Sequence, residues 1–427
     1  MFLTLEDPNA KIKGSRDPLG VQPVWSAFAR HVVTNLTSVT GSLRGFTVLL
    51  LGRYLVEQAI DDGQLPRESA LEGFLRFEQI AAYARHVGHG VDSDIRGIER
   101  VKRNVDEGRG RVTIGTNRDG YILGDQKIYG LWGLFSVSAR VSGLITDGPI
   151  GVQERTRAFI EAEYRLRLDA VWKPLQRLVA RGGTLATRGR DPVLEAVASV
   201  LPEGLSRREA WFYGESLRDA QHVESAPPGR QGFFAALLRR YGNLDGSIDR
   251  EEVLSLAEWA RERDAELARR LKRIATLESL FAPSATLFDH ILTRHGQKLG
   301  DVAAELADRW GRAVPNFDPA AFDDLVPEIA HAATEEFALH CKQCAGALAA
   351  GAYEDAVRTL LDLNAAVMRG RQGAPWARME SGRIDVRYRG SEQLLPDAEA
   401  LGALWRNGYF IESLKRITGK VGNGAQG

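Results

Sequence analysis

Two imidazoles and two carboxylates stand within nine residues of this sequence, at His86, His89, Asp92 and Asp94, in a stretch interrupted by glycines. Imidazole nitrogens and carboxylate oxygens are common ligands of metal ions, and the same groups act as general acids and bases. A glycine-broken turn lets such side chains converge. The segment therefore predicts a metal or acid–base site. The alternative is a helix end where the histidines meet the helix dipole and an aspartate caps the next helix.

Residues 109–182 predict a recognition module. A short strand at 111–115 is followed by a compact helix at 125–135, a break at Ser136-Val-Ser138, and a second short helix. A glycine-rich segment at 143–151 then precedes a long helix that starts near Val152. This order is similar to that of a winged helix, whose second helix enters the DNA major groove.

In a module of this kind, a set of serines and arginines would contact duplex DNA. Ser136, Ser138, Arg140 and Ser142 would face the groove, and Arg155 and Arg157 would contact phosphates. Two alternatives stay open. The aromatic residues of the segment, such as Trp132 and Phe135, would also fit a helical core, and a module of this shape also serves to bind protein.

Two further motifs have chemical interpretations. The segment Tyr241–Glu252 matches a calcium-binding loop except at its first position, where Tyr241 supplies no carboxylate. The alternative is that Asp249 caps a helix, with Glu252 three residues later. Cys341 and Cys344 have the spacing of half a zinc site, but they also fit a single helix over 326–349 as small buried side chains.

Other motifs of common enzymes are missing from the sequence. There is no P-loop, no HExxH, no GxSxG, and no glycine-rich nucleotide loop after a strand. No cofactor is therefore expected. This pattern favours a non-catalytic scaffold or recognition subunit that contacts other proteins and duplex DNA. The alternative is an unfamiliar enzyme that uses the cluster at residues 86–94.

Composition narrows the class of protein. The 427 residues contain 56 basic and 56 acidic side chains, so the net charge of zero argues against a general polyanion binder. Two cysteines are too few for a disulfide framework.

The start of the chain lacks a signal-peptide pattern. The apolar run Phe46–Gly52 is far shorter than the ~20 residues of a membrane span. We expect a cytoplasmic protein with no membrane contact.

Helical periodicity dominates the chain and predicts a mainly α protein. Long apolar helices are expected over 24–59 and 68–87, and a helical hairpin of the tetratricopeptide type over 345–361. Strand alternation at 383–388 precedes a closing helix from Pro396. The predicted fold is a multi-helical bundle or repeat with a winged-helix-like module and a small C-terminal α/β cap. The predicted domains are 1–108 (helical), 109–182 (winged-helix-like), 183–300 (helical), 301–372 (helical hairpin) and 373–427 (α/β cap).

Three short segments carry a resemblance. Asp17-Pro-Leu-Gly, Leu131-Trp-Gly-Leu-Phe135 and Leu404-Trp-Arg-Asn-Gly-Tyr-Phe410 resemble segments of uncharacterised helical proteins from bacterial anti-phage defence islands. The matching segments cover about 20 residues. The resemblance implies an accessory role in a defence complex and assigns no catalytic residue.

Overall fold

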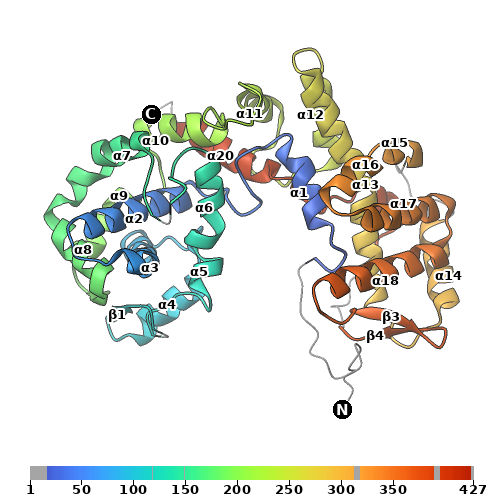
Figure 1. The fold of residues 1–427 in the computed structure, drawn as a ribbon, viewed down its shortest axis with the longest axis horizontal. Helices are drawn as coiled ribbons and strands as arrows, with labels where there is room; N and C mark the ends of the chain where they lie inside the picture. The colour runs from blue at the N-terminus through green and yellow to red at the C-terminus, as the bar shows by residue number, and fades with distance from the viewer. Residues whose placement is uncertain (1–16, 118, 149, 312–317, 389–394, 425–427) are drawn as a thin grey trace. The chain divides into compact units, whose positions relative to one another are not determined.

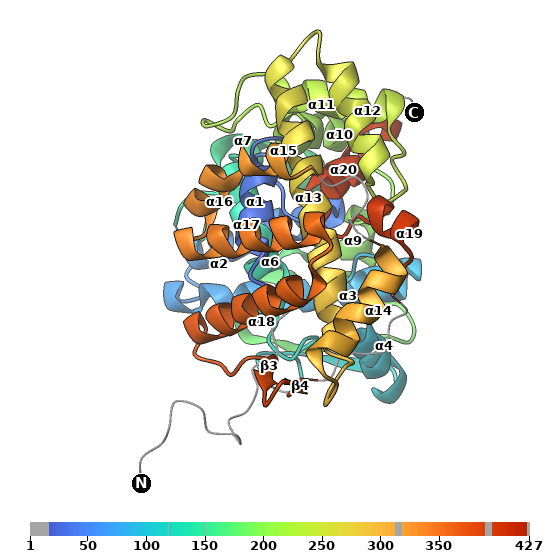
Figure 2. The same ribbon diagram turned by 90° about the vertical axis from the view of Figure 1, so that its right-hand side faces the viewer.

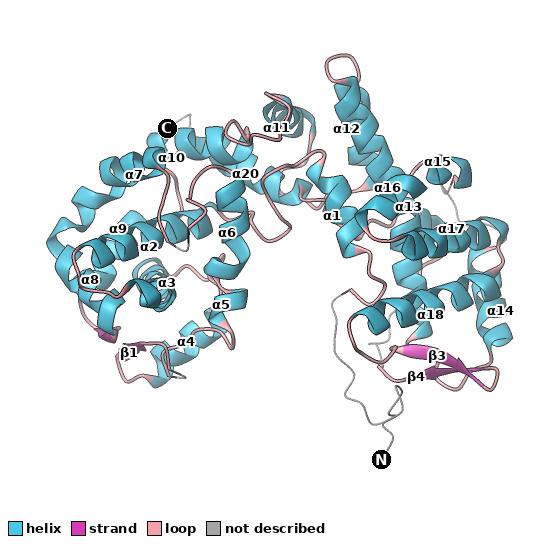
Figure 3. Ribbon diagram, viewed as in Figure 1, coloured by secondary structure: helices cyan, strands magenta, loops and turns pink. Residues whose placement is uncertain are grey.

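The computed structural model describes residues 17–117, 119–148, 150–311, 318–388 and 395–424. Over these residues the protein is mainly α-helical, with two small two-stranded antiparallel sheets (Figure 3). The prediction of a mainly α protein is confirmed. Within the described ranges, no helix combines the length and the apolar character that crossing a membrane requires.

The chain forms two compact units, each named here after its central helix. The α2 unit contains residues 33–246 and 410–427, and the α13 unit contains residues 1–32 and 247–409. Each unit therefore combines segments that are distant in the sequence. This division differs from the five consecutive segments predicted above, because the first and last helices each pack with a partner far along the chain.

The predicted helix over 24–59 is two helices that belong to different units. α1 (Gln22–Arg30) lies in the α13 unit, and α2 (Leu43–Asp61) lies in the α2 unit. Polar side chains stabilise the turn that separates them. The hydroxyl of Thr40 accepts a hydrogen bond from the backbone N–H of Thr37 at 2.7 Å, and the hydroxyl of Ser42 accepts one from the N–H of Gly45 at the start of α2.

The α2 unit is built from helices and one strand pair, with α20 joining from the end of the chain. Its helices are α2, α3 (Ala70–His89), α4 (Ile98–Glu107), α5 (Gln126–Tyr129), α6 (Leu131–Val141), α7 (Glu154–Ile160), α8 (Trp172–Arg181), α9 (Pro192–Val200), α10 (Arg207–Tyr213), α11 (Arg230–Tyr241) and α20 (Ile411–Gly424). Short 3₁₀ or π segments occupy Arg67–Ser69, Glu161–Arg165, Leu166–Val171 and Gly214–Arg218. The strands β1 (Arg111–Ile114) and β2 (Gly183–Ala186) pair antiparallel, with Val112 opposite Leu185.

Helix α2 lies at the centre of this unit. From Leu43 to Val56 every residue is buried, and α3, α6, α7 and α8 pack around it (Figure 1). Two glycines let its neighbours approach closely. A Cβ at Gly45 would lie 2.6 Å from the ring of Phe135 on α6, and a Cβ at Gly52 would lie 2.7 Å from Phe77 on α3. The close packing of α6 on α2 therefore depends on the absence of a side chain at Gly45.

The α13 unit contains the remaining elements. They are α1, α12 (Arg250–Ala260), α13 (Ala265–Ile291), α14 (Leu299–Trp310), α15 (Pro319–Asp323), α16 (Val326–Ala332), α17 (Glu335–Ala350), α18 (Tyr353–Gly370), β3 (Ala377–Glu380), β4 (Arg383–Val386) and α19 (Ala398–Ala403). β3 and β4 form a hairpin, with Met379 opposite Ile384, and β3 packs on α18. The predicted C-terminal cap is thus divided, because the hairpin belongs to this unit and α20 to the other.

The predicted helical hairpin corresponds to α17 and α18, which lie side by side in Figure 2. Gly351 ends α17 in the left-handed conformation, with φ of 67°. The helix predicted over 326–349 is divided in two, because Thr334 caps α17 by accepting a hydrogen bond from the N–H of Phe337. Cys341 and Cys344 are free and buried, and burial raises the pKa of both thiols.

The predicted cap at the calcium-like loop is also present. The carboxylate of Asp249 accepts a hydrogen bond from the N–H of Glu252 at 2.8 Å and begins α12. This contact is the helix-capping alternative considered for the Tyr241–Glu252 segment.

Replacing Gly45 by alanine tests the close contact between α2 and α6. We expect Gly45→Ala to lower the free energy of unfolding by ~1–3 kcal/mol, because the new methyl group overlaps the Phe135 ring. Gly346→Ala is the matched control: this glycine is exposed within α17 and has no atom within 4 Å of its Cβ position, so alanine should stabilise by up to ~1 kcal/mol. Urea unfolding measures both. Equal stability of Gly45→Ala and the wild type would contradict the contact.

Candidate functional site

The start of α6 differs from the prediction. α5 and α6 are separated at Gly130, and α6 continues without interruption through Ser136 and Ser138 to Val141. The predicted break at 136–138 and the separate second helix are therefore wrong. A carboxylate from another helix explains the actual boundary: Glu78 on α3 accepts a hydrogen bond from the N–H of Leu131 at 2.7 Å, the first residue of α6. Gly130 itself has no side chain to cap the helix.

The serines of α6 and its end do not face solvent. Ser138 and Ser142 are 0 % exposed. The Ser138 hydroxyl donates to Thr40, and Asn35 donates to the Ser142 oxygen at 3.0 Å. The Ser136 oxygen is buried as well. The prediction that these serines face a DNA groove is wrong, because each hydroxyl lies on the inner side of α6.

The three arginines of the predicted module each have an internal partner. Arg155 donates to the Ser216 hydroxyl and stacks over the Phe212 ring, and burial lowers its pKa. Arg157 pairs with Glu57 at 2.9 Å. Arg140 is 39 % exposed and pairs with Asp147 at 3.4 Å. DNA binding by this module stays a prediction, and Arg140 is the most accessible of these cations.

The segment after α6 does not complete a winged helix. A single antiparallel bridge joins Ile145 to Val152, while β1 pairs with β2, which lies beyond the predicted module. The loop is fastened to α2 by Arg53, whose guanidinium donates to the carbonyl oxygens of Gly148 and Gly151, each at 3.1 Å. Burial lowers the pKa of Arg53 to about 10.

The outer side of α5 and α6 carries exposed apolar residues. Ile128 is 53 % exposed, Tyr129 is 56 % exposed and Val137 is 51 % exposed. These three residues define what we call the α5–α6 face. The two helices approach closely at Gly133, where an added Cβ would lie 2.2 Å from the carbonyl oxygen of Ile128, and Val137 follows one helical turn later. The sequence assigned Ile128 and Tyr129 to a helix but did not identify them as a surface.

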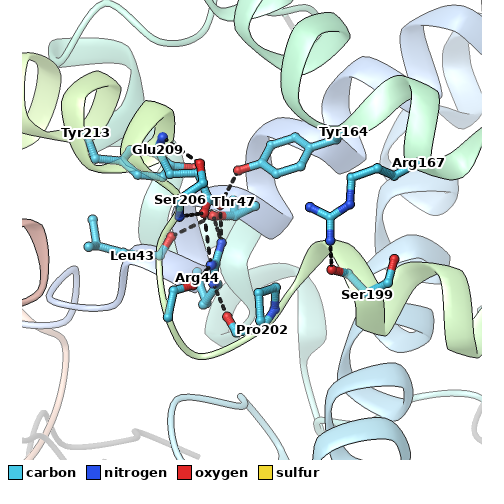
Figure 4. Close-up of polar contacts among 12 residues, drawn as sticks. Leu43, Arg44, Thr47, Tyr164, Arg167, Ser199, Pro202, Ser206, Glu209 and Tyr213 are labelled. Atoms are coloured by element: carbon cyan, nitrogen blue, oxygen red, sulfur yellow. Dashed lines mark hydrogen bonds and ion pairs between the residues drawn. The ribbon is translucent and has the colours of Figure 1, made fainter. Parts of the chain in front are cut away.

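A buried polar network joins α2 to α10 (Figure 4). Arg44 and Glu209 form an ion pair with side chains that are only 2 % and 4 % exposed. The Arg44 guanidinium also donates to the carbonyl oxygens of Pro202 and Gly204. The Tyr164 hydroxyl donates to Glu209 at 2.5 Å. Although burial opposes the charged form, Glu209 raises the pKa of Arg44.

The Arg44 network is closed to ligands because its polar atoms are used internally. The remaining oxygen of Glu209 accepts from the backbone N–H of Ser206, which completes the cap of α10. Burial raises the pKa of Tyr164 and Tyr213, so both phenols stay neutral. A neighbouring cavity lined by Arg44, Glu78 and Arg85 has only about 20 Å³ of free space, room for one water molecule.

The four residues of the predicted metal or acid–base site have separate partners. His86 pairs with Asp92 at 3.0 Å, and Asp92 also pairs with Lys102. His89 donates to the carbonyl oxygen of Ala198 at 2.7 Å. Asp94 pairs with Lys420 of α20 at 3.1 Å.

The predicted ligands therefore do not share a centre. Among the described residues, no group of three His, Cys, Asp or Glu side chains is placed to hold a metal ion. α3 continues to His89 and ends at Gly90 in the left-handed conformation, and the two aspartates that follow it pair with Lys102 and Lys420. The helix end of the alternative is present, but neither aspartate caps the next helix, because the N-cap residue of α4 is Gly97.

Comparison with known proteins adds no relative: no family model, no curated protein sequence and no solved structure matches this chain.

The buried carboxyl of Glu78 gives the unit a pH-dependent stability. Burial raises the pKa of Glu78 to about 7, against the opposing hydrogen bonds from Leu131 and Gln126. The folded state thus holds this proton more tightly than the unfolded state. The contribution of the protonated Glu78 carboxyl to the free energy of unfolding is fully present below the unfolded pKa near 4.5. It is lost as the pH rises through 7.

Glu78→Gln tests this proton linkage. From pH 5 to pH 8, we expect the unfolding free energy of the variant to gain on the order of 2–3 kcal/mol relative to the wild type, because glutamine has no proton to lose. Urea unfolding at the two pH values measures the difference. A difference between the two proteins that does not change with pH would show that Glu78 is not the titrating group.

Proposed function

We propose that this chain is a non-catalytic recognition subunit of a multi-protein complex and that it binds a partner protein through the α5–α6 face. The observation that carries the proposal is the exposure of Ile128, Tyr129 and Val137 on the adjoining helices α5 and α6. Apolar and aromatic side chains that stay accessible on neighbouring turns are typical of protein interfaces.

The way α6 is held supports the same proposal. Its first turn is capped by Glu78, and its middle packs on Gly45 and Phe46 of α2 through Phe135, with the Phe46 and Phe135 ring centroids 5.0 Å apart. Its end is bonded through Ser142. A helix fixed at three points loses little conformational entropy on binding, which favours its use as a docking surface.

The electrostatic contacts favour a protein over DNA as the partner of this face. Arg155 and Arg157 already have internal partners, so a phosphate would have to compete with Ser216 and Glu57 for them. The enzyme alternative at His86, His89, Asp92 and Asp94 gains no support from the geometry, since these side chains contact separate partners. The resemblance to defence-island proteins makes an anti-phage defence complex the setting that we propose.

The partner interface is tested by purifying the tagged full-length chain from the organism that produces it. We expect the wild type to elute from size exclusion with a stoichiometric partner protein. Val137→Asp places a charge on the apolar face and should reduce recovery of that partner at least about tenfold, since burying an unpaired carboxylate is costly.

Leu339→Asp is the matched control for this experiment. Leu339 is a 54 % exposed apolar residue on α17 in the other unit, so the same change in charge should leave recovery unaltered. The proposal fails if the wild type elutes alone. It also fails if Val137→Asp, folded as judged by circular dichroism, retains the partner as well as Leu339→Asp does.

A further inference from the structure

A groove in the α2 unit lies where α11 packs against α20, the two neighbouring helices in Figure 1. It consists of two adjoining cavities of about 450 and 560 Å³, and Arg239 and Thr418 line both. We call this the α11–α20 groove. Each volume lies within the ~300–1,000 Å³ typical of small-molecule sites. The groove is independent of the α5–α6 face.

Small residues keep the groove open. Gly232 and Ala236 line it from α11, and Gly419 and Gly422 line it from α20. The nearest atom to a Cβ at Gly422 would be Arg239 Cδ, at 3.7 Å. Larger side chains at these positions would occupy the space that the groove now offers.

The lining of the groove is strongly cationic, unlike the neutral chain as a whole. It contains two carboxylates, Asp219 and Asp245, and five cationic side chains, which are Arg218, Arg239, Arg240, Arg416 and Lys420. Arg218 is neutralised by Asp219 through two hydrogen bonds of 2.6 Å, and Lys420 by Asp94.

The other three arginines remain available to a ligand. Arg239, Arg240 and Arg416 are exposed, and none forms an ion pair with a carboxylate of the described residues. Arg240 lies over the ring of Tyr241, which leaves its N–H donors accessible. Several guanidinium groups converging without enough carboxylates create a site for an anion.

A buried hydroxyl beneath the groove is unsatisfied. Thr418 is 1 % exposed and lines both cavities, yet its oxygen has no hydrogen-bond partner among the described residues. A buried polar atom without a partner weakens the folded state, and such atoms are rare in proteins. An oxyanion between Arg239 and Arg416 would supply the missing acceptor.

We propose that the α11–α20 groove binds a ligand that carries two adjacent phosphate groups. One cavity would hold the first phosphate with Arg416, the other would hold the second with Arg240, and Arg239 lies between them. Guanidinium groups suit phosphate because their planar donors match its oxygens in pairs. Two sources provide this chemistry, a nucleoside polyphosphate and the backbone of a nucleic-acid strand.

Direct binding to the full-length protein tests the groove and distinguishes the sources. The probes are a fluorescent nucleoside diphosphate, a short fluorescein-labelled single strand and the corresponding duplex, each followed by anisotropy. Binding of the nucleotide alone identifies a small-molecule site, and binding of a strand identifies a nucleic-acid site. In either case we expect affinity to fall between about 50 and 200 mM salt.

The double variant Arg239→Ala/Arg416→Ala should weaken binding about tenfold or more and make it less dependent on salt. Arg190→Ala/Arg358→Ala removes the same charge from exposed arginines outside the groove and should change affinity less than about twofold. Thr418→Val should keep the fold, because its hydroxyl has no internal partner, and weaken binding a few-fold.

Three results would overturn the proposal. The first is no binding of any probe at low salt. The second is equal weakening by the two double variants, which would indicate attraction by general charge alone. The third is unchanged affinity in both Arg239→Ala/Arg416→Ala and Thr418→Val when circular dichroism shows that each variant is folded.

Discussion

The α2 unit depends on the need to compensate the positive charge of Arg44 inside its core. A buried guanidinium is costly unless a counter-charge and acceptors surround it. Glu209 provides the charge, and the carbonyl oxygens of Pro202 and Gly204 provide acceptors, so α10 and the segment before it must lie against α2. Removing either member of the pair would leave the other charge buried alone. This requirement ties α2 to α10 and to the segment before it.

The α5–α6 face results from the contacts that fix α6 against α2 and α3. Gly45, the residue after Arg44, admits the ring of Phe135, and Glu78 on α3 caps the first turn of α6. These contacts turn the hydroxyls of Ser138 and Ser142 inward and leave Val137 outside. The same packing that buries the predicted DNA-contacting serines therefore leaves an apolar side chain exposed.

Helix α20 forms one side of the α11–α20 groove. In the sequence it follows residues 247–409 of the α13 unit, yet it packs against α10 and α11 of the α2 unit. This return places Arg416 beside Arg239, and Lys420 beside Asp94. Through Lys420 the same helix supplies the partner of Asp94, one of the expected metal ligands.

The sequence by itself determined the features that depend on neighbouring residues. Helical periodicity predicted a mainly α protein, and the cap at Asp249 was evident from local residue types. Only the tertiary structure decided where α6 begins, which face of it is exposed, and which helices share a unit. Glu78 caps a helix 53 residues away, and α20 joins helices that precede it by more than 160 residues. The spacing of residues within a segment does not predict such contacts, because burial and charge compensation depend on which distant segments pack together.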